Sequence, residues 1–349
     1  MEHHSRHYMT SLIQRIVMRA RYKVYALQSI LKKSRIQRHV TRLSCTEKNF
    51  NSFPNVAVIF QTFNKEHMIR KVLHPFLKSG FKNIVIFADG CADRTLQTAS
   101  RMLQGRNHIV IGTNNLHEIT TYSIASYLSP YLDADYLLLA QDDDIYPDDF
   151  SWLTAAIELM RTDLHIATIG FNGGYDFSAP IADSDPDFAT AQHRSKESDG
   201  ISVAELLPYF SIVSKKLSFS QNSYSYDYVD IIDRAPQLIR LAFLREAGGF
   251  PSNFAPYNYD DIFLCLAAWR RGYKVVHMPI RSVVRNVGIG GMRLFKTLMT
   301  NGRPAHLGRN WHYIYEEYSN FINSGELRRE VEKAHSQEFS RGKKGNAFA

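Results

Sequence analysis

Short apolar runs alternate with stretches of helical periodicity from residue 55 onward. Each apolar run has the length of a buried strand, and each stretch between two runs has the apolar spacing of a helix. This alternation is typical of a mostly parallel sheet with crossover helices, so the chain is predicted to have an α/β fold. The predicted strands are 56–61, 83–88, 108–112 and 135–141, and the predicted helices are 65–78, 94–103 and 116–132.

The first 43 residues form a basic amphipathic segment. This segment contains ten Lys and Arg residues and one Glu, so its net charge is +9. The whole chain has a net charge of +8, and the remaining 306 residues therefore have a net charge of −1. A helix of this kind packs on its own protein or binds an anionic membrane surface, and both interpretations stay open. Nucleic acid is not expected as a partner. The apolar face consists of Met9, Leu12, Ile13, Ile16, Ala20, Val24, Leu27 and Leu31.

The composition is that of a globular protein. The chain has 349 residues, of which 44% are hydrophobic and 22% charged, enough for a sizeable core. No apolar run approaches the roughly 20 residues that a membrane-spanning helix needs. Three scattered cysteines predict neither a disulfide framework nor a zinc site. We therefore expect a cytoplasmic protein, peripheral at the inner face of a membrane if the basic segment binds lipid.

Three adjacent carboxylates, Asp142, Asp143 and Asp144, directly follow the fourth predicted strand. Ligands of parallel α/β sheets bind beyond the carboxyl ends of the strands, so chemistry is expected here. No Lys or Arg lies between residues 107 and 160, and the acids are therefore expected to need a cation from outside. Mn²⁺ or Mg²⁺ suits carboxylate oxygens. The alternative is an acidic cap for a helix that starts near Pro147, although a cap needs one acid and not three.

The ends of three predicted strands resemble motifs of a known enzyme family. Residues 56–64 (VAVIFQTFN), 87–93 (FADGCAD) and 138–144 (LLAQDDD) resemble the nucleotide-sugar half of the family 2 glycosyltransferases, which have the GT-A fold. In that family these strands end in a Pro-x-Tyr-Asn-like motif, an Asp-Asp-Gly-Ser motif and a DxD motif. The chain departs from the family with Gln61 in place of Pro and Ala88 in place of the first acid of the second motif.

The resemblance implies roles for individual residues. Asp142 and Asp144 are expected to hold the Mn²⁺ or Mg²⁺ ion that bridges the donor diphosphate, and Asp89 is expected to contact the nucleoside. The further residues expected to bind substrate are Gln61, Thr62, Asn64, Asp93, Asp143 and Asp230.

The second half of the chain resembles the acceptor half of the same family. Val229-Asp230 leads to Gly248-Gly249-Phe250, and Asp260-Asp261 opens a helix that Gly272-Tyr273 closes. The resemblance implies that Asp261 is the catalytic base and that Asp260 stands for the family's Glu, while Phe263 replaces a further acid. Sugar transfer needs such a base to deprotonate the acceptor hydroxyl. The two acids could equally cap the helix, a role compatible with catalysis.

Residues 172–228 form a long polar stretch of the kind that serves as a functional lid or an insertion. Within it Tyr224, Tyr226 and Tyr228 alternate, which favours a half-buried strand over a surface that stacks on sugar. The glycine-rich segment 287–291 is interpreted as a flexible loop near the product phosphates.

Together these motifs predict an inverting, metal-dependent glycosyltransferase of GT-A type. It would move one sugar from a nucleotide-diphosphate sugar, with a UDP-sugar favoured, to a glycan or lipid-linked acceptor hydroxyl. The alternatives are a membrane-docked module that binds nucleotide sugars without turnover and a metal-dependent phosphotransferase or phosphohydrolase. A dehalogenase-type hydrolase would need Thr where Tyr146 stands.

The expected organisation has four parts, the third of which forms a mixed acceptor-side subdomain. They are a basic helical arm at 1–50, a nucleotide-sugar-binding half at 51–145, an acceptor-binding and catalytic half at 146–290, and a C-terminal helical extension at 291–349.

Overall fold

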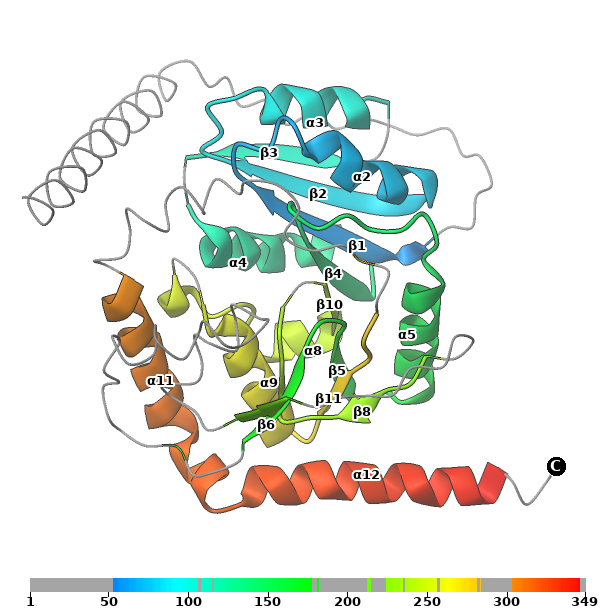
Figure 1. Cartoon of the computed structure of the whole chain (residues 1–349), viewed down its shortest axis with the longest axis vertical. Helices are drawn as coiled ribbons and strands as arrows, with labels where there is room; N and C mark the ends of the chain where they lie inside the picture. Colours follow the sequence, from blue (N-terminus) through cyan, green and yellow to red (C-terminus); the bar gives the residue numbers. More distant parts are fainter. Residues whose placement is uncertain are drawn as a thin grey trace, which may run out of the picture.

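The computed structural model of the protein describes the central sheet, the helices that cover it and a smaller second sheet (Figure 1). The predicted arm at 1–50 and the glycine-rich segment 287–291 lie outside the described residues. The described residues are 53–105, 108–114, 116–177, 181, 212–214, 224–234, 236–255, 258–280, 283 and 303–345.

The central sheet is mostly parallel. In sheet order its strands are β3 (Ile109–Thr113), β2 (Phe81–Asp89), β1 (Phe53–Thr62), β4 (Tyr136–Gln141), β10 (Gln237–Arg240), β5 (Ile166–Gly170), β11 (Lys274–His277) and β8 (Asp227–Tyr228). Strands β3, β2, β1 and β4 run parallel, as do β5 and β11. Strand β10 is antiparallel to both β4 and β5, and β8 is antiparallel to β11, so the half of the sheet built from later residues is mixed.

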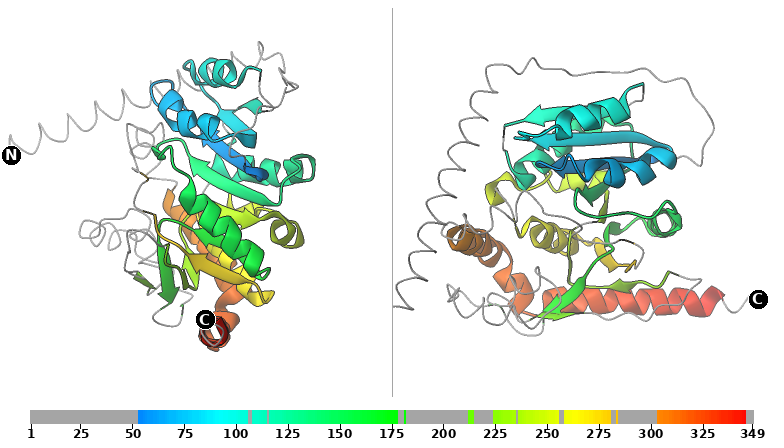
Figure 2. Two further views of the ribbon diagram at one scale, coloured as in Figure 1. Left: turned by 90° about the vertical axis from the view of Figure 1, so that its right-hand side faces the viewer. Right: turned by 45° about the horizontal axis from the view of Figure 1, so that its top comes forward.

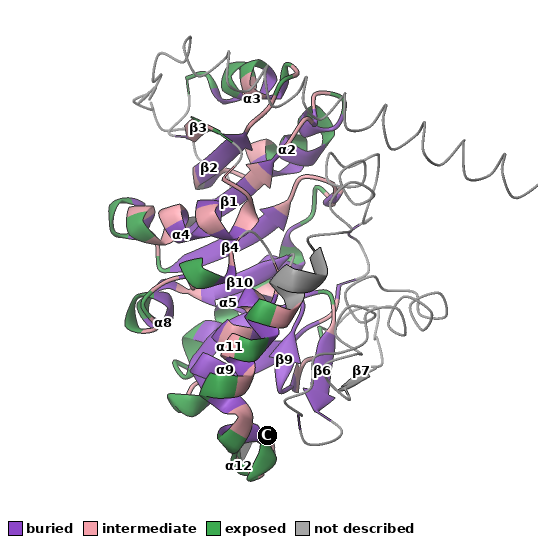
Figure 3. Cartoon of the chain, turned by 90° about the vertical axis from the view of Figure 1, so that its left-hand side faces the viewer, coloured by how far each residue is buried: buried purple, intermediate pink, exposed green. Residues whose placement is uncertain are grey.

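Helices cover both faces of this sheet. Helices α2 (Ile69–Lys78) and α5 (Ser151–Thr162) lie on one face, and α4 (Glu118–Leu128) and α8 (Leu241–Glu246) lie on the other (Figures 2 and 3). Helix α3 (Thr95–Leu103) packs beside α2. Because helices cover both faces, the middle of the central strands is apolar, and every residue from Val56 to Phe60 is fully buried.

A second, antiparallel sheet lies beside the central one. Its order is β7 (Ile212–Ser214), β6 (Gly174–Phe177) and β9 (Ile231–Ile232). Helix α9 (Asp260–Arg270) packs against β9 and β11. Two C-terminal helices, α11 (Arg303–Asn323) and α12 (Glu326–Gly345), both pack against α9, and α12 crosses the base of the molecule (Figure 1).

The predicted α/β class is confirmed, and the predicted strands and helices of the first half all form. Two boundaries differ by four residues, and the others differ by three or fewer. Helix α2 starts at Ile69 because a turn precedes it, in which the N–H groups of Met68 and Ile69 both donate to the Lys65 carbonyl. Helix α4 ends at Leu128, where a short 3₁₀ turn that contains Pro130 follows, since proline lacks the N–H that continues a helix.

The motifs of the second half also take the expected local structures. Gly248 and Gly249 follow α8 with φ of 84° and 87°, a left-handed conformation that favours glycine. Of the alternating tyrosines, Tyr228 lies in strand β8 while Tyr224 is exposed, so the strand is shorter than the alternation predicts. Over the described part of the chain, no helix combines the length and apolar character required to span a membrane.

Candidate functional site

Eight of the predicted site residues meet at one edge of the central sheet, called here the carboxyl edge. Strands β1, β2 and β4 are parallel, so the residues that follow them lie at the same edge. Strand β10 is antiparallel to β4, which places Arg234, just ahead of β10, at this edge as well. The residues brought to the edge are Gln61, Thr62, Asn64, Asp89, Asp93, Asp142, Asp143 and Asp144.

The acids after β4 have a basic neighbour. Lys65 Nζ lies 3.4 Å from Asp142 Oδ1 and 4.0 Å from Asp143 Oδ2, and the Lys65 side chain is only 3% exposed. The expectation that these acids depend wholly on an outside cation is therefore wrong. Lys65 belongs to the turn after β1, and the parallel pairing of β1 with β4 brings it to the acids from far away in the sequence.

The Asp142 side chain is half-buried at the carboxyl edge, with 15% of it exposed. Burial raises the pKa of Asp142 to about 6, although Lys65 and hydrogen bonds from Thr62 and Phe63 lower it. The Phe63 backbone N–H donates to Asp142 Oδ2 over 3.2 Å. Since burial opposes the charged form of this carboxylate, a further cation beside it would be stabilising.

The acid run fits a divalent cation in charge and in donor type. Three carboxylates against Lys65 leave a formal charge of −2, which one Mn²⁺ or Mg²⁺ balances. Among the described residues, no three Asp, Glu, His or Cys side chains form a complete cage for a metal. A partial set is sufficient for an ion that takes one or two protein carboxylates and completes its shell with ligand phosphates.

Helix capping does not require Asp142, Asp143 or Asp144. The Ser151 N–H at the start of α5 donates to Asp149 Oδ1 over 2.9 Å, so Asp149 satisfies the first N–H of this helix. Asp148 forms an exposed ion pair with Lys78. Capping of α5 therefore does not explain the three adjacent acids.

Asn64 joins the loops that follow β1 and β2. It has a left-handed backbone, with φ of 53°, which asparagine adopts more readily than most residues. Asn64 Oδ1 accepts the Ala92 N–H over 2.7 Å. Asp93 accepts the N–H groups of Glu66 over 3.0 Å and Thr95 over 2.9 Å. Asn64 and Asp93 thus shape this edge, and their direct contact with substrate stays a prediction.

Asp89 holds the loop between β3 and α4. It is 1% exposed, and its carboxylate accepts the Thr113 hydroxyl over 2.7 Å and the N–H groups of Leu116 and His117 over 2.7 and 2.8 Å. The Gln61 amide adds a weaker contact of 3.4 Å. An ionised carboxylate can accept about four hydrogen bonds, and these four donors therefore occupy the acceptor positions of Asp89. The contact of Asp89 with the nucleoside stays a prediction.

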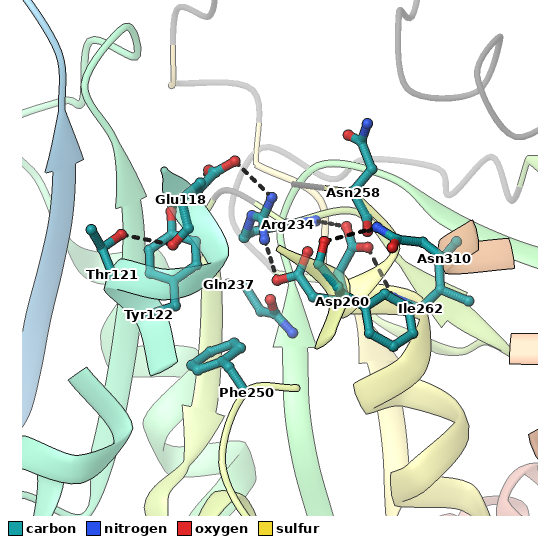
Figure 4. A network of polar contacts seen from close by, with 12 residues as sticks. Glu118, Thr121, Tyr122, Arg234, Gln237, Phe250, Asn258, Asp260, Ile262 and Asn310 are labelled. Atoms are coloured by element: carbon teal, nitrogen blue, oxygen red, sulfur yellow. Dashed lines mark hydrogen bonds and ion pairs between the residues drawn. The ribbon is translucent and has the colours of Figure 1, made fainter. Parts of the chain in front are cut away.

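Asp260 and Asp261 form the first turn of α9, and they differ in environment. Figure 4 shows Asp260 beside Arg234. Asp260 is fully buried and forms an ion pair with the Arg234 guanidinium. Asp261 is half-buried: its Oδ2 accepts the Arg234 backbone N–H over 3.1 Å, and its Oδ1 accepts the Ile262 N–H over 2.9 Å. Of the two, only Asp261 is partly exposed to solvent.

The buried pair shifts the pKa values of both partners. Burial raises the pKa of Asp260 to about 7; Arg234 lowers it, while Asp261 and Glu118 raise it further. For Arg234 burial opposes the charge, but the carboxylates of Asp260 and Glu118 raise its pKa well above the usual value. Arg234 therefore stays positive at the centre of several acids.

Asp230 lies in the bend between β8 and β9. It is 2% exposed, its Oδ2 accepts the Phe177 N–H over 2.7 Å, and its own N–H donates to Asp176 Oδ1 over 3.2 Å. Asp233 accepts the Tyr175 hydroxyl over 2.7 Å. Both acids are thus tied to β6, and the substrate contact expected of Asp230 stays a prediction.

Comparison with known proteins gives a distant structural likeness. Neither a known protein family nor a curated protein matches the chain. Solved structures of S. aureus TarS are similar to it, and the chain spans 60% of the first two. TarS 1–349 with UDP-GlcNAc is 14% identical over 69% of this chain and 60% of that one, with a TM-score of 0.43. TarS 1–349 with UDP is 15% identical over 65% of this chain and 60% of that one, with a TM-score of 0.40. TarS 1–349 alone is 13% identical over 79% and 81%, with a TM-score of 0.42. Likeness at this level assigns no function.

The sequence motifs did not reveal Lys65, Glu118, Arg234 and Asn310. Lys65 directly follows the Asn64 motif, and Glu118 belongs to the acid-rich segment, so both had a signal in the sequence. Arg234 contacts Glu118 from a distant loop, and Asn310 of α11 bonds the backbone ahead of α9. These two pairings depend on how the elements pack, which no local pattern reveals.

Proposed function

We propose that the chain is a glycosyltransferase that moves one sugar from a nucleotide-diphosphate sugar to an acceptor hydroxyl, with inversion. The observation that carries the proposal is the meeting of two acidic sets at the carboxyl edge. The run 142–144 with Lys65 suits a metal-bound diphosphate, and Asp261 suits proton removal. Arg234 connects the start of α4 with the start of α9, because it pairs with Glu118 and with Asp260 (Figure 4).

The first set serves the leaving group. Departure of a nucleoside diphosphate requires its growing negative charge to be neutralised. Lys65 supplies one positive charge at the edge. Asp142 and Asp144 would hold Mn²⁺ or Mg²⁺, which supplies Lewis-acid stabilisation of the phosphate oxygens when bound.

The second set serves the acceptor. Two backbone N–H groups, those of Arg234 and Ile262, hold the Asp261 carboxylate in one orientation. Its partial exposure leaves room for an acceptor hydroxyl, whose proton Asp261 would take as the oxygen attacks the sugar. A single attack opposite the leaving diphosphate inverts the configuration of the sugar carbon, and no covalent sugar–protein intermediate is required.

The proposed acceptor is a glycan or a lipid-linked precursor at the cytoplasmic face of a membrane. The support comes from the sequence, because residues 1–43 carry +9 on an amphipathic helical pattern. A UDP-sugar is the favoured donor, and UDP-GlcNAc, with which TarS was crystallised, is a convenient first probe.

The test is to incubate the full-length chain with UDP-, GDP- and dTDP-sugars, with and without Mn²⁺, and to measure binding by thermal shift and nucleoside diphosphate release. A ligand well above its Kd stabilises by about 3 kcal/mol. Metal-dependent release of the diphosphate supports the proposal. Binding without release in the presence of candidate acceptors indicates the non-catalytic module, and release of inorganic phosphate from phosphate esters indicates the hydrolase.

A further inference from the structure

Arg234 contacts two parts of the site that are far apart in the sequence. Its Nη2 lies 3.0 Å from Glu118 Oε2 at the start of α4, and its Nη1 pairs with the fully buried Asp260 at the start of α9 (Figure 4). The Arg234 backbone N–H donates to Asp261 Oδ2 over 3.1 Å. A single residue thus holds the first residue of α4 and both carboxylates of α9.

The guanidinium is fixed in this position. The Arg234 side chain is 8% exposed, and its guanidinium carbon lies 5.0 Å from the centre of the Tyr122 ring. The Tyr122 hydroxyl donates to Glu118 Oε1 over 3.0 Å, so the ring and the carboxylate confine the guanidinium together. Arginine suits such a place because its planar fork reaches two carboxylates and stacks on a ring, whereas lysine offers one point charge.

The contacts continue from Glu118 toward the nucleotide side. Asp89, at the end of β2, accepts the N–H groups of Leu116 and His117, the two residues that precede Glu118. A continuous series of bonds therefore leads from Asp89 through the start of α4 and Arg234 to Asp261. The series connects a loop at the expected donor site with the expected base.

We propose that Arg234 is a positioning residue that couples donor occupancy at the carboxyl edge to the placement of Asp261, an inference that rests on the proposed function. In this role Arg234 acts through Glu118 and the acids of α9 and needs no contact of its own with donor or acceptor. A donor that orders the loop ahead of α4 fixes Glu118, and Glu118 fixes Arg234. Arg234 then orients the Asp261 carboxylate toward the acceptor.

The test is a double-mutant cycle with kinetics of UDP release from the UDP-sugar that the wild-type protein cleaves fastest. Arg234→Gln should lower kcat by about a hundredfold and leave KM unchanged, because a misplaced base costs that much while donor contacts remain. The kcat of Arg234→Lys should lie between those of the wild type and Arg234→Gln. Glu118→Gln should lower kcat in the wild-type background and have no further effect in Arg234→Gln, since the bridge is already broken.

Arg240→Gln is the matched control. Arg240 is also partly buried, lies over the Tyr136 ring and bonds the Ile166 carbonyl, but it is at the opposite end of β10. This variant should lose stability and keep kcat. An equal loss of kcat from Glu118→Gln in both backgrounds, or a raised KM with unchanged kcat in Arg234→Gln, overturns the coupling.

Two further measurements test the role of Arg234 when the double-mutant cycle cannot be completed. If Arg234→Gln does not fold, Glu118→Gln must still lower kcat without raising KM, although Glu118 has no direct bond to Asp261. If the wild-type protein releases a nucleoside diphosphate from none of the UDP-, GDP- and dTDP-sugars, the proposed function fails, and amide hydrogen exchange tests the bridge. Arg234→Gln must then speed exchange in the first turns of α4 and α9 together, and faster exchange in α9 alone overturns it.

Discussion

At the scale of single residues, charge balance determines what the carboxyl edge can bind. Asp142, Asp143 and Asp144 carry three negative charges, and Lys65 returns one positive charge. We predict that Asp142→Asn combined with Asp144→Asn abolishes Mn²⁺-dependent binding of UDP and leaves the fold intact, because the change removes mutual repulsion along with the ion's ligands. Titration calorimetry with UDP, with and without Mn²⁺, measures the effect.

Asp148→Asn is the control for this double variant, since Asp148 lies on the same loop in an exposed pair with Lys78. It should bind UDP and Mn²⁺ as the wild type does. A double variant whose UDP affinity keeps its full Mn²⁺ dependence would show that Asp142 and Asp144 do not hold the ion.

The buried carboxylate of Asp260 predicts a pH dependence of stability. Its pKa is about 7 in the folded protein because of burial, against an ordinary value of 3.8. The folded state therefore holds this proton more tightly than the unfolded state, and stability present below pH 4 is lost as the pH rises through about 7. Denaturant unfolding should show that the free energy of unfolding falls more between pH 5 and pH 8 for the wild type than for Asp260→Asn. Equal losses in both proteins would mean that Arg234 keeps Asp260 ionised throughout.

The sequence predicts residues whose surroundings are local. Asp142 directly follows an apolar strand, and Asp261 directly opens an apolar helix, so the local sequence pattern was enough to single out both residues. Lys65 and Arg234 meet their partners only through strand pairing and helix packing. Their own segments contain no sign of these partners, and the charge balance of the site could therefore not be predicted.

At the scale of elements, α11 fixes the turn that leads into α9. Asn310 of α11 is fully buried, and its Nδ2 donates to the carbonyls of Phe254 over 2.8 Å and Asn258 over 3.0 Å. Asn258 and Tyr259 both have left-handed backbones, with φ of 74° and 71°, which cost energy outside glycine. The amide of Asn310 therefore stabilises a strained turn directly ahead of the proposed base.

We predict that Asn310→Leu destabilises the protein by about 2 kcal/mol, because it leaves buried carbonyls without a donor. It should also lower kcat for UDP release by a larger factor than it raises KM. Asn323→Leu is the control: Asn323 is on the same helix and bonds the backbone of Ile181, but it is exposed. Equal kinetics for the two variants would remove Asn310 from the positioning of α9.

Elements were predicted more reliably than their boundaries. Runs such as Tyr136 to Ala140 are long and apolar enough to specify a buried strand by themselves. The start of α2 at Ile69 depends on a turn whose backbone bonds converge on the Lys65 carbonyl, and hydrophobic spacing does not report such bonds. The mixed half of the sheet was expected only through the family resemblance.

At the scale of the whole molecule, charge is divided between the N-terminal segment and the rest of the chain. Residues 1–43 carry +9, and each Lys or Arg near an anionic leaflet contributes about 1 kcal/mol. We predict that deleting residues 1–43 leaves UDP binding intact and abolishes sedimentation with vesicles that contain phosphatidylserine. Salt should weaken the binding of the full chain, because screening acts over about 8 Å at physiological ionic strength. Full-length protein that stays in the supernatant at low salt would assign the segment to packing.

The central claim is that the carboxyl edge and Asp261 together transfer a sugar. Its most direct measurement is UDP release from a saturating UDP-sugar with Mn²⁺ and acceptor, for the wild type and Asp261→Asn, with the anomeric configuration of the product read by NMR. We predict release by the wild type with an inverted product, and a rate about a hundredfold or more lower for Asp261→Asn at unchanged donor affinity. Equal rates for the two proteins, or a product of retained configuration, would contradict the account.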